Sequence, residues 1–246
     1  MRIKNLLGNK KKNLSYYYEF INYINDFDNI IIISKGYQLN DFISKKPDEK
    51  TLYIGIKQSI LLLPKKDILV MNDYEGLFGL EDIICDIKII ICPTIIHYKH
   101  HRSNVSNIKF QNYLKLNKFK GQIIYFSMIS NNTKILHFCP IDSSEVVFYM
   151  LDKLNILNKN IYIYGLYSNI KDNEFMMNKI KNVKIDEDFK DDYNSYLERV
   201  INKKVEVNKK FICQNGLIDE NLKKKKNELI IKFADLFNKN NIEFCN

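Results

Sequence analysis

The residues of this chain that could do chemistry come directly after short apolar runs. The first run, Ile30–Ser34, ends in the turn Ser34-Lys35-Gly36, which combines a hydroxyl, a cation and a glycine. Later runs end in other hydroxyl, amide and cationic groups, and this mixture suits a nucleotide or a sugar. Carboxylates are few among them, which does not suit a metal ion. The candidate nucleotide- and donor-binding residues are Ser34, Gly36, Lys57, Gln58, Asp73, Ser143, Ser144 and Gly165.

Several of these residues also have a purely structural interpretation. Gly36 is a single turn glycine and is not part of a GxGxxG or P-loop pattern. Lys57 is one of many lysines, and Asp73 could equally cap the following turn. Ser143 and Ser144 stand at the start of a predicted helix, where capping alone explains them, although a helix N-terminus also binds anions. The sequence leaves these alternatives open.

Three of the four histidines lie in the segment HYKHHRSN, beside Arg102. Their spacings of three and one, in a predicted loop without a nearby carboxylate, do not match the i, i+4 helical spacing of many metal ligands. We therefore expect no metal and no cofactor. A basic loop for a phosphate or an acceptor sugar and a plain solvated loop both remain open. No Ser/His/Asp or Cys/His arrangement supports hydrolysis.

Six β-branched apolar runs occupy the first two thirds of the chain. Most are continuous, which is typical of strands buried on both faces of a parallel sheet. Helical patterns precede the first run, at 15–25, and the last, at 143–157. The sequence predicts an α/β fold with a doubly wound, mostly parallel, Rossmann-like sheet, whose carboxyl edge gathers the candidate residues. The runs are Ile30–Ser34, Thr51–Ile56, Asp67–Met71, Ile87–Cys92, Gln122–Phe126 and Asn160–Tyr164.

The chain becomes polar and charged after Gly165. Residues 167–210 form a predicted lid-like segment of a Rossmann-like domain, 1–210, and residues 211–246 a helical C-terminal extension. The final helix, predicted from Asp219 to Asn238, is basic and carries an apolar stripe. It either packs on the sheet domain or lies on an anionic membrane surface. The stripe consists of Leu229, Ile230, Phe233, Leu236 and Phe237.

The overall composition limits the partners, the cysteine chemistry and the cellular location that we expect. The 246 residues are 46% hydrophobic and carry a formal net charge of +9, which is compatible with nucleic acid, an anionic membrane or a phosphorylated donor. Five cysteines without a CxxC pair argue against a disulfide framework and a zinc ribbon. No signal peptide or membrane-length apolar run is visible. We expect a cytoplasmic protein, free or peripherally attached to a membrane through its basic C-terminal helix, and leave homo-oligomerisation open.

The segment CPIDSSEVVFYMLDKLNILNKNIYIYGLYSN resembles a segment of bacterial lipooligosaccharide sialyltransferases that ends in a strand of the type IYLxGxD. It is also similar to the related domain of motility-associated glycosyltransferases of nonulosonic acids. IIIISKGYQLNDF resembles the first strand and glycine turn of that family, and LYIGIKQSILLLPKKDILVMND resembles the second and third strands. The likeness covers Asn29 to Ser168.

This resemblance implies a Rossmann-like domain that binds a cytidine-monophosphate sugar and transfers the sugar with inversion, without a metal. Ser34 and Gly36 would lie by the donor phosphate or ribose, Gln58 or Lys57 by the nucleotide, and Gly165 where the last strand approaches the base. Ser143 and Ser144 would hold the nucleotide.

The family uses a lid histidine as general base, and this chain has none after His137. Asp191 or Asp192 is the predicted replacement, because a positioned carboxylate can take a proton from an acceptor hydroxyl. Tyr193 is predicted to stabilise the departing phosphate.

The sequence thus predicts a glycosyltransferase that uses a CMP-sialic-acid type of donor on a surface glycan. One alternative is a nucleotide-binding relative of the same fold without transfer activity. The other is a basic RNA-associated protein, suggested by the lysine clusters Lys10–Lys12 and Lys223–Lys226. Nucleic acid is the less favoured partner, because the lysines are not interleaved with aromatic residues in an RNA-binding motif.

Overall fold

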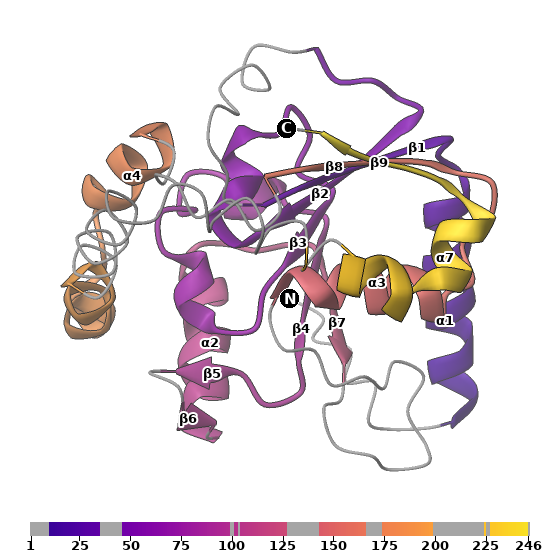
Figure 1. Ribbon diagram of the computed structural model, residues 1–246. Helices are drawn as coiled ribbons and strands as arrows, with labels where there is room; N and C mark the ends of the chain where they lie inside the picture. The colour runs from indigo at the N-terminus through magenta and orange to yellow at the C-terminus, as the bar shows by residue number, and fades with distance from the viewer. Residues whose placement is uncertain are drawn as a thin grey trace.

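A seven-stranded sheet, parallel throughout, forms the centre of the computed structural model (Figure 1). Its strand order is β7-β4-β3-β2-β1-β8-β9. The strands are β1 Asn29–Ile33, β2 Thr51–Ile56, β3 Ile68–Val70, β4 Ile89–Pro93, β7 Gln122–Phe126, β8 Asn160–Tyr164 and β9 Asn241–Cys245. The structure describes residues 10–34, 46–98, 101–102, 104–126, 143–165, 174–198, 224 and 227–245.

The predicted parallel α/β sheet is confirmed. Each of the six predicted apolar runs contains all or most of a strand, and the central strands β2, β3 and β4 are buried along their whole length. Along β1, Ile30 and Ile32 point into one core while Ile33 points into the other. Since both faces of the strand are covered, both sets of alternating side chains must be apolar.

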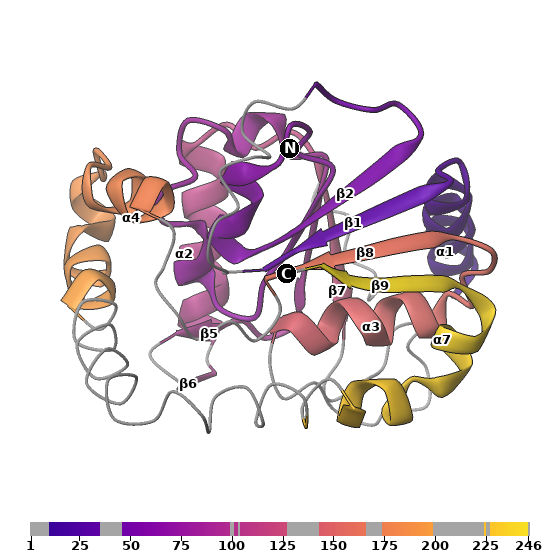
Figure 2. The ribbon, with the colours of Figure 1, turned by 45° about the horizontal axis from the view of Figure 1, so that its top comes forward.

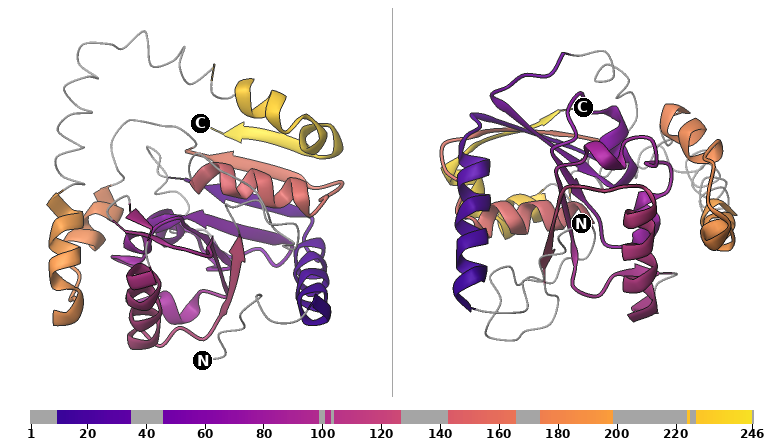
Figure 3. Two further views of the ribbon diagram at one scale, coloured as in Figure 1. Left: turned by 90° about the horizontal axis from the view of Figure 1, so that it is seen from below. Right: turned by 180° about the vertical axis from the view of Figure 1, so that it is seen from behind.

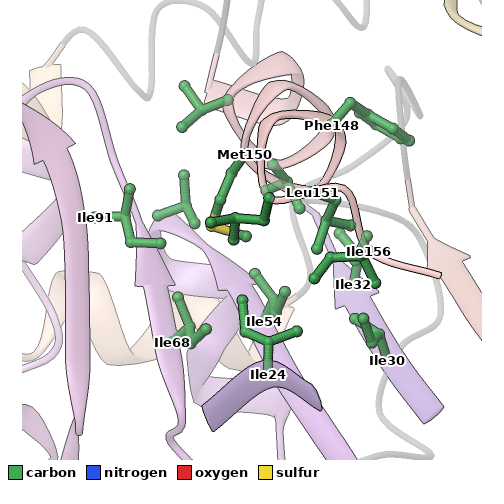
Figure 4. Close-up of a cluster of buried hydrophobic side chains, with 14 of the residues drawn as sticks. Ile24, Ile30, Ile32, Ile54, Ile68, Ile91, Phe148, Met150, Leu151 and Ile156 are labelled. Atoms are coloured by element: carbon green, nitrogen blue, oxygen red, sulfur yellow. The ribbon is translucent and has the colours of Figure 1, made fainter. Parts of the chain in front are cut away.

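The first core lies under three helices, α1 Lys10–Asn25, α3 Ser143–Lys153 and α7 Ala234–Lys239 (Figure 2). In the close-up, Met150 and Leu151 of α3 lie over the isoleucines of the strands, including Ile54 and Ile91 (Figure 4). These apolar positions recur at helical spacing, so α3 forms at the predicted place and its stripe faces the sheet.

The second core lies on the opposite face. Short 3-10 turns and helices cover it, with α2 and α4 on the far side of the sheet from α1 and α3 (Figure 3). Residues 190–198 are also helical and contribute side chains to this core. The elements are η2 Lys57–Leu62, η3 Tyr74–Leu77, η4 Ile84–Asp86, α2 Asn104–Leu116, α4 Glu174–Lys181 and η5 Glu187–Phe189.

The C-terminal region differs from the prediction of a helical extension. Residues 227–232 and α7 are helical, but the chain then enters β9, which pairs in parallel with β8. The five-residue run NIEFC has only alternating apolar residues, so it carries a weak signal compared with the longer apolar stripe before it. The helical extension is not confirmed, because the chain beyond α7 completes the sheet.

Most of the apolar stripe of the C-terminal helical region packs on the sheet domain. The ring of Phe233 lies 5.7 Å from that of Phe148 and 4.9 Å from that of Tyr149, both on α3. Leu229 and Leu236 are 2% exposed. The structure therefore uses these positions to cover the first core, as in the first of the two predicted alternatives.

Candidate functional site at the carboxyl edge

The strand order reverses between β1 and β8. The chain moves from β1 to β2 on one side and from β8 to β9 on the other, so the two connections leave in opposite directions. The backbone amide of Ser34 donates to the carbonyl of Tyr164 at 2.9 Å, which sets the first residues beyond these two strands side by side. Gly165 has a φ of 65°, a left-handed conformation that favours glycine. Such a reversal point is where open α/β sheets bind ligands.

The turn after β2 brings a third strand end to this edge. The hydroxyl of Ser59 accepts from the Ile56 amide at 2.9 Å. It also lies 2.8 Å from the Ile33 carbonyl, which joins η2 to the end of β1. Lys57 has a φ of 54°, an uncommon conformation for a residue with a side chain. A fixed, strained turn therefore starts directly beyond β2.

Lys57 and Asp73 form an ion pair across the ends of β2 and β3. The Lys57 Nζ atom lies 2.6 Å from Asp73 Oδ2, and the side chains are 29% and 22% exposed. The other carboxylate oxygen accepts from the Gly76 amide at 3.1 Å and caps η3. Asp73 thus has the capping role that the sequence left open, and it also orients a partly exposed ammonium group at the edge.

Two buried polar atoms beside these strand ends have no hydrogen-bond partner among the described residues. Gln58 is fully buried, and its amide nitrogen donates to the carbonyls of Glu75 at 3.0 Å and Phe78 at 3.2 Å. Its Oε1 atom is unpaired, as is Oδ1 of Asn72, the second residue after β3. Buried polar atoms are normally paired, so unpaired ones often mark a ligand or water site.

The remaining candidate residues are Ser143, Ser144 and Gly36. Ser143 is the first residue of α3, on the opposite face of the sheet from η2, and is 6% exposed. Because α3 connects two parallel strands, its N-terminus lies on the carboxyl side. The side chain of Ser144 and the whole of Gly36 lie outside the described residues. The structure thus brings together Ser34, Lys57, Gln58, Asp73 and Gly165, with Ser143 across the edge.

The residues predicted to be catalytic lie on the helix 190–198, which packs on the second core. Asp192 is 5% exposed, accepts from the hydroxyl of Tyr74, and pairs with Lys109 Nζ at 2.5 Å. These contacts tie the helix to η3 and α2, so a structural role is sufficient to explain Asp192. Asp191 is exposed, and its assignment as a base stays a prediction.

Tyr193 likewise makes packing contacts. Its hydroxyl donates to the Ile180 carbonyl, and its ring stands edge-on to Phe78 at 5.8 Å. Burial, followed by the charge of Glu81, raises the pKa of the tyrosine. A tyrosine whose hydroxyl already binds a backbone carbonyl is poorly placed to meet a phosphate, so the structure offers no support for that role.

The described parts of the histidine segment are two short strands rather than a loop. Strands β5 His97–Tyr98 and β6 His101–Arg102 pair antiparallel, with His97 opposite Arg102. Asn107 of α2 holds the approach to it, since its side chain binds the Ile96 amide at 2.9 Å and the Thr94 carbonyl at 3.0 Å. In the part of the chain that the structure describes, no group of three or more His, Cys, Asp or Glu side chains could hold a metal ion.

Glu81 is a residue that the sequence did not single out. One carboxylate oxygen accepts from the hydroxyl of Tyr113 and from the Gly79 amide at 3.2 Å, while the other, Oε2, is buried and unpaired. Burial raises the pKa of Glu81 to about 7. Nothing in the segment GLEDIICD signals this, because the partner tyrosine lies 32 residues further along.

The raised pKa of Glu81 predicts a pH-dependent stability. The unfolded chain loses this proton near pH 4.5 and the folded chain near 7, so stability contributed by the neutral form is lost as pH rises between them. We expect Glu81→Gln, which stays neutral, to gain on the order of 1–2 kcal/mol over the parent from pH 4.5 to pH 7.5. Urea unfolding of both proteins at three pH values measures this. If the unfolding free energies of the two proteins change with pH by the same amount, the prediction is wrong.

The family models, the curated proteins and the solved structures with which the chain was compared contain no match to it. Among the described residues, none of the helices is long and apolar enough to cross a membrane. The chemistry of the carboxyl edge is therefore the basis for a proposed function.

Proposed function

We propose that the chain is a metal-independent glycosyltransferase that takes a sugar from a CMP-sialic-acid type of donor and transfers it to a surface glycan. The observation that carries the proposal is the reversal point, where Ser34 and Gly165 follow adjacent strands. A nucleotide bound there lies over the strand ends, within reach of the residues that follow β2 and β3.

The residues at this edge supply the contacts that a nucleotide needs. The Lys57 ammonium is partly exposed and would bind a phosphate oxygen. It would give up part of its contact with Asp73 in doing so. Asp73 would accept from a ribose hydroxyl or a base amino group. Ser143, at the start of an 11-residue helix, offers a hydroxyl and a helix N-terminus to an anion. Gly165 has no side chain to obstruct the ligand.

A second candidate is a nucleotide-binding protein of the same fold that does not transfer sugar. The observation in its favour is that Asp192 and Tyr193 are buried and engaged with protein groups. Asp191 is then the one predicted catalytic residue with an exposed side chain. Turnover of a bound donor separates the two candidates, because both predict binding.

The first test is a calorimetric and thermal-shift screen against CMP, CMP-sialic acid, UDP- and GDP-sugars and a short RNA. A ligand that binds the native state raises the melting temperature by mass action. We expect stabilisation by the cytidine nucleotides alone. A response to RNA only, weakened by salt, would instead favour the RNA-associated alternative.

The site predicts that substitution of Lys57 weakens nucleotide binding. We expect Lys57→Met to weaken CMP binding about tenfold or more, because a charge-assisted phosphate contact is worth about 1.5–3 kcal/mol. Lys115→Met, at an exposed position in the last turn of α2, is the matched control and should bind as the parent does. The partly exposed pair with Asp73 contributes about 1 kcal/mol or less to folding, so both variants should fold. Equal binding by both variants would remove Lys57 from the site.

A further inference from the structure

Two adjoining hollows border the loop after η3, and both are lined by Glu81 and Lys184. The larger, of about 600 Å³, has a size typical of small-ligand pockets. The smaller, of about 280 Å³, reaches the end of α2. Since α2 runs back from the carboxyl end of β4, its last turn lies toward the amino edge, so these hollows are separate from the site above. Their lining comes from the loop residues 79–82, from the ends of α2 and α4, and from residues 182–186.

Glu81 is the unusual group in this groove. Its Oε1 atom is held by the Tyr113 hydroxyl and the Gly79 amide, so the carboxyl group is fixed on one side. Its Oε2 atom is buried without a hydrogen-bond partner in the described structure. An unpaired buried carboxylate oxygen costs folding free energy. Because Oε2 is inaccessible in this structure, the carboxyl group has to turn toward the hollow before a bound hydrogen-bond donor can remove that cost.

The rest of the lining combines hydrogen-bonding and apolar groups. The amides of Asn117, Asn178 and Asn182 can each donate and accept. Leu116, Val183 and Ile185 add apolar surface. A saccharide ring presents both kinds of surface, since its hydroxyls need donors and acceptors and its C–H faces need apolar contact.

We propose that this groove is a second ligand site, which binds a hydroxyl-rich ligand of sugar size, with one hydroxyl donating to Glu81 Oε2 after the carboxyl group has turned toward the hollow. This assignment does not rest on the proposed function, because its residues lie apart from the carboxyl edge. Gly79 and the docked helix α4 shape the groove: a side chain on Gly79, whose φ is 88°, would lie 3.0 Å from Ile180. The absence of that side chain lets α4 close one wall.

The proposed contact is pH-sensitive in a defined direction. A hydroxyl donates best to an ionised carboxylate, and burial raises the pKa of Glu81 to about 7. Affinity should therefore rise as pH increases through 7. The other titratable groups around Glu81 are Asp82 beside it, Tyr113 on α2, Tyr193 on the helix 190–198, and Lys179, Lys184 and Asp186 in the lining.

The test is an NMR titration of the full chain with methyl α-D-glucopyranoside and the methyl glycoside of N-acetylglucosamine. 1,4-Dioxane serves as the control, because it is a ring without hydroxyl groups. We expect shifts of the backbone amides of 79–82 and 182–184 with one or both glycosides and none with dioxane. Affinity should be several-fold higher at pH 8 than at pH 6.

Variants separate a ligand contact from a folding effect. Glu81→Gln should lower affinity about tenfold at pH 8 and remove its pH dependence. Asn182→Ala changes an exposed residue that should not affect folding, and it should weaken binding several-fold. The proposal is overturned if neither glycoside shifts these amides, if dioxane shifts them equally, or if both variants bind like the parent. These outcomes are independent of CMP binding at the carboxyl edge.

Discussion

Gly55→Ala is expected to destabilise the protein by about 3 kcal/mol, the upper end of the usual cost of overpacking, because the site has no room for a methyl group. A methyl group at Gly55 would lie 2.5 Å from both Cα and Cβ of Ile60 and 2.8 Å from its amide nitrogen. These are atoms of η2 close to its backbone, so no rotamer change can relieve the overlap. Either β2 or η2 has to move.

The same displacement should abolish ligand binding at the carboxyl edge. If η2 moves, Ser59 leaves the Ile33 carbonyl and Lys57 leaves Asp73, two contacts that hold the site together. For a chain of this length we expect the melting temperature to fall by about 6–12 °C. Thermal unfolding followed by circular dichroism, with CMP binding measured on the folded variant, tests both effects.

Gly76→Ala is the matched control for Gly55→Ala. A methyl group there would lie 3.4 Å from Cγ of Lys57 and 3.5 Å from Cβ of Met71, both ordinary contacts. We expect a change in stability within about 1 kcal/mol. If Gly55→Ala is as stable as Gly76→Ala, then η2 is not packed against β2 as the structure has it.

The sheet could be predicted from the sequence because the apolar pattern that identifies a buried strand lies within the strand itself. A strand covered on both faces must be apolar at nearly every position, and Thr51–Ile56, which is buried throughout, shows this pattern without reference to any other segment. β9 carries no such signal. It lies at an edge with only Ile242 and Phe244 turned toward the core, and it follows α7, which packs on the same core through Leu236.

The candidate site could be predicted only in part, for the same reason. Ser34 and Gly165 follow strands, so the sheet rule alone places them at one edge. Asp192 and Tyr193 also had suitable chemistry, but their neighbours decide their roles. Tyr74, which donates to Asp192, is 118 residues away along the chain, so the sequence around Asp192 does not predict this contact.

Asp67→Ala is the second large effect that we expect, at about 3–5 kcal/mol of lost stability. Asp67 precedes β3 at the amino edge and is fully buried. Its carboxylate accepts from the Tyr53 amide at 3.2 Å and the Tyr23 hydroxyl at 3.4 Å. It also pairs with Lys88 at 2.8 Å. Removing it leaves a buried amide unpaired and a cation uncompensated.

Asp67→Asn separates these two costs. The amide oxygen of asparagine can still accept from the Tyr53 amide, so the variant loses the charge attraction to Lys88 and Lys65 and the oxygen that faces the Tyr23 hydroxyl. Because the Lys88 side chain is 52% exposed and can be solvated, we expect this variant to lose about 1–2 kcal/mol, well under the loss in Asp67→Ala. Urea unfolding of the three proteins gives the comparison. If both variants lose the same stability, then the ion pair rather than the buried hydrogen bond holds β2 and β3 in register at this edge, and Lys88→Met should then lose as much as either.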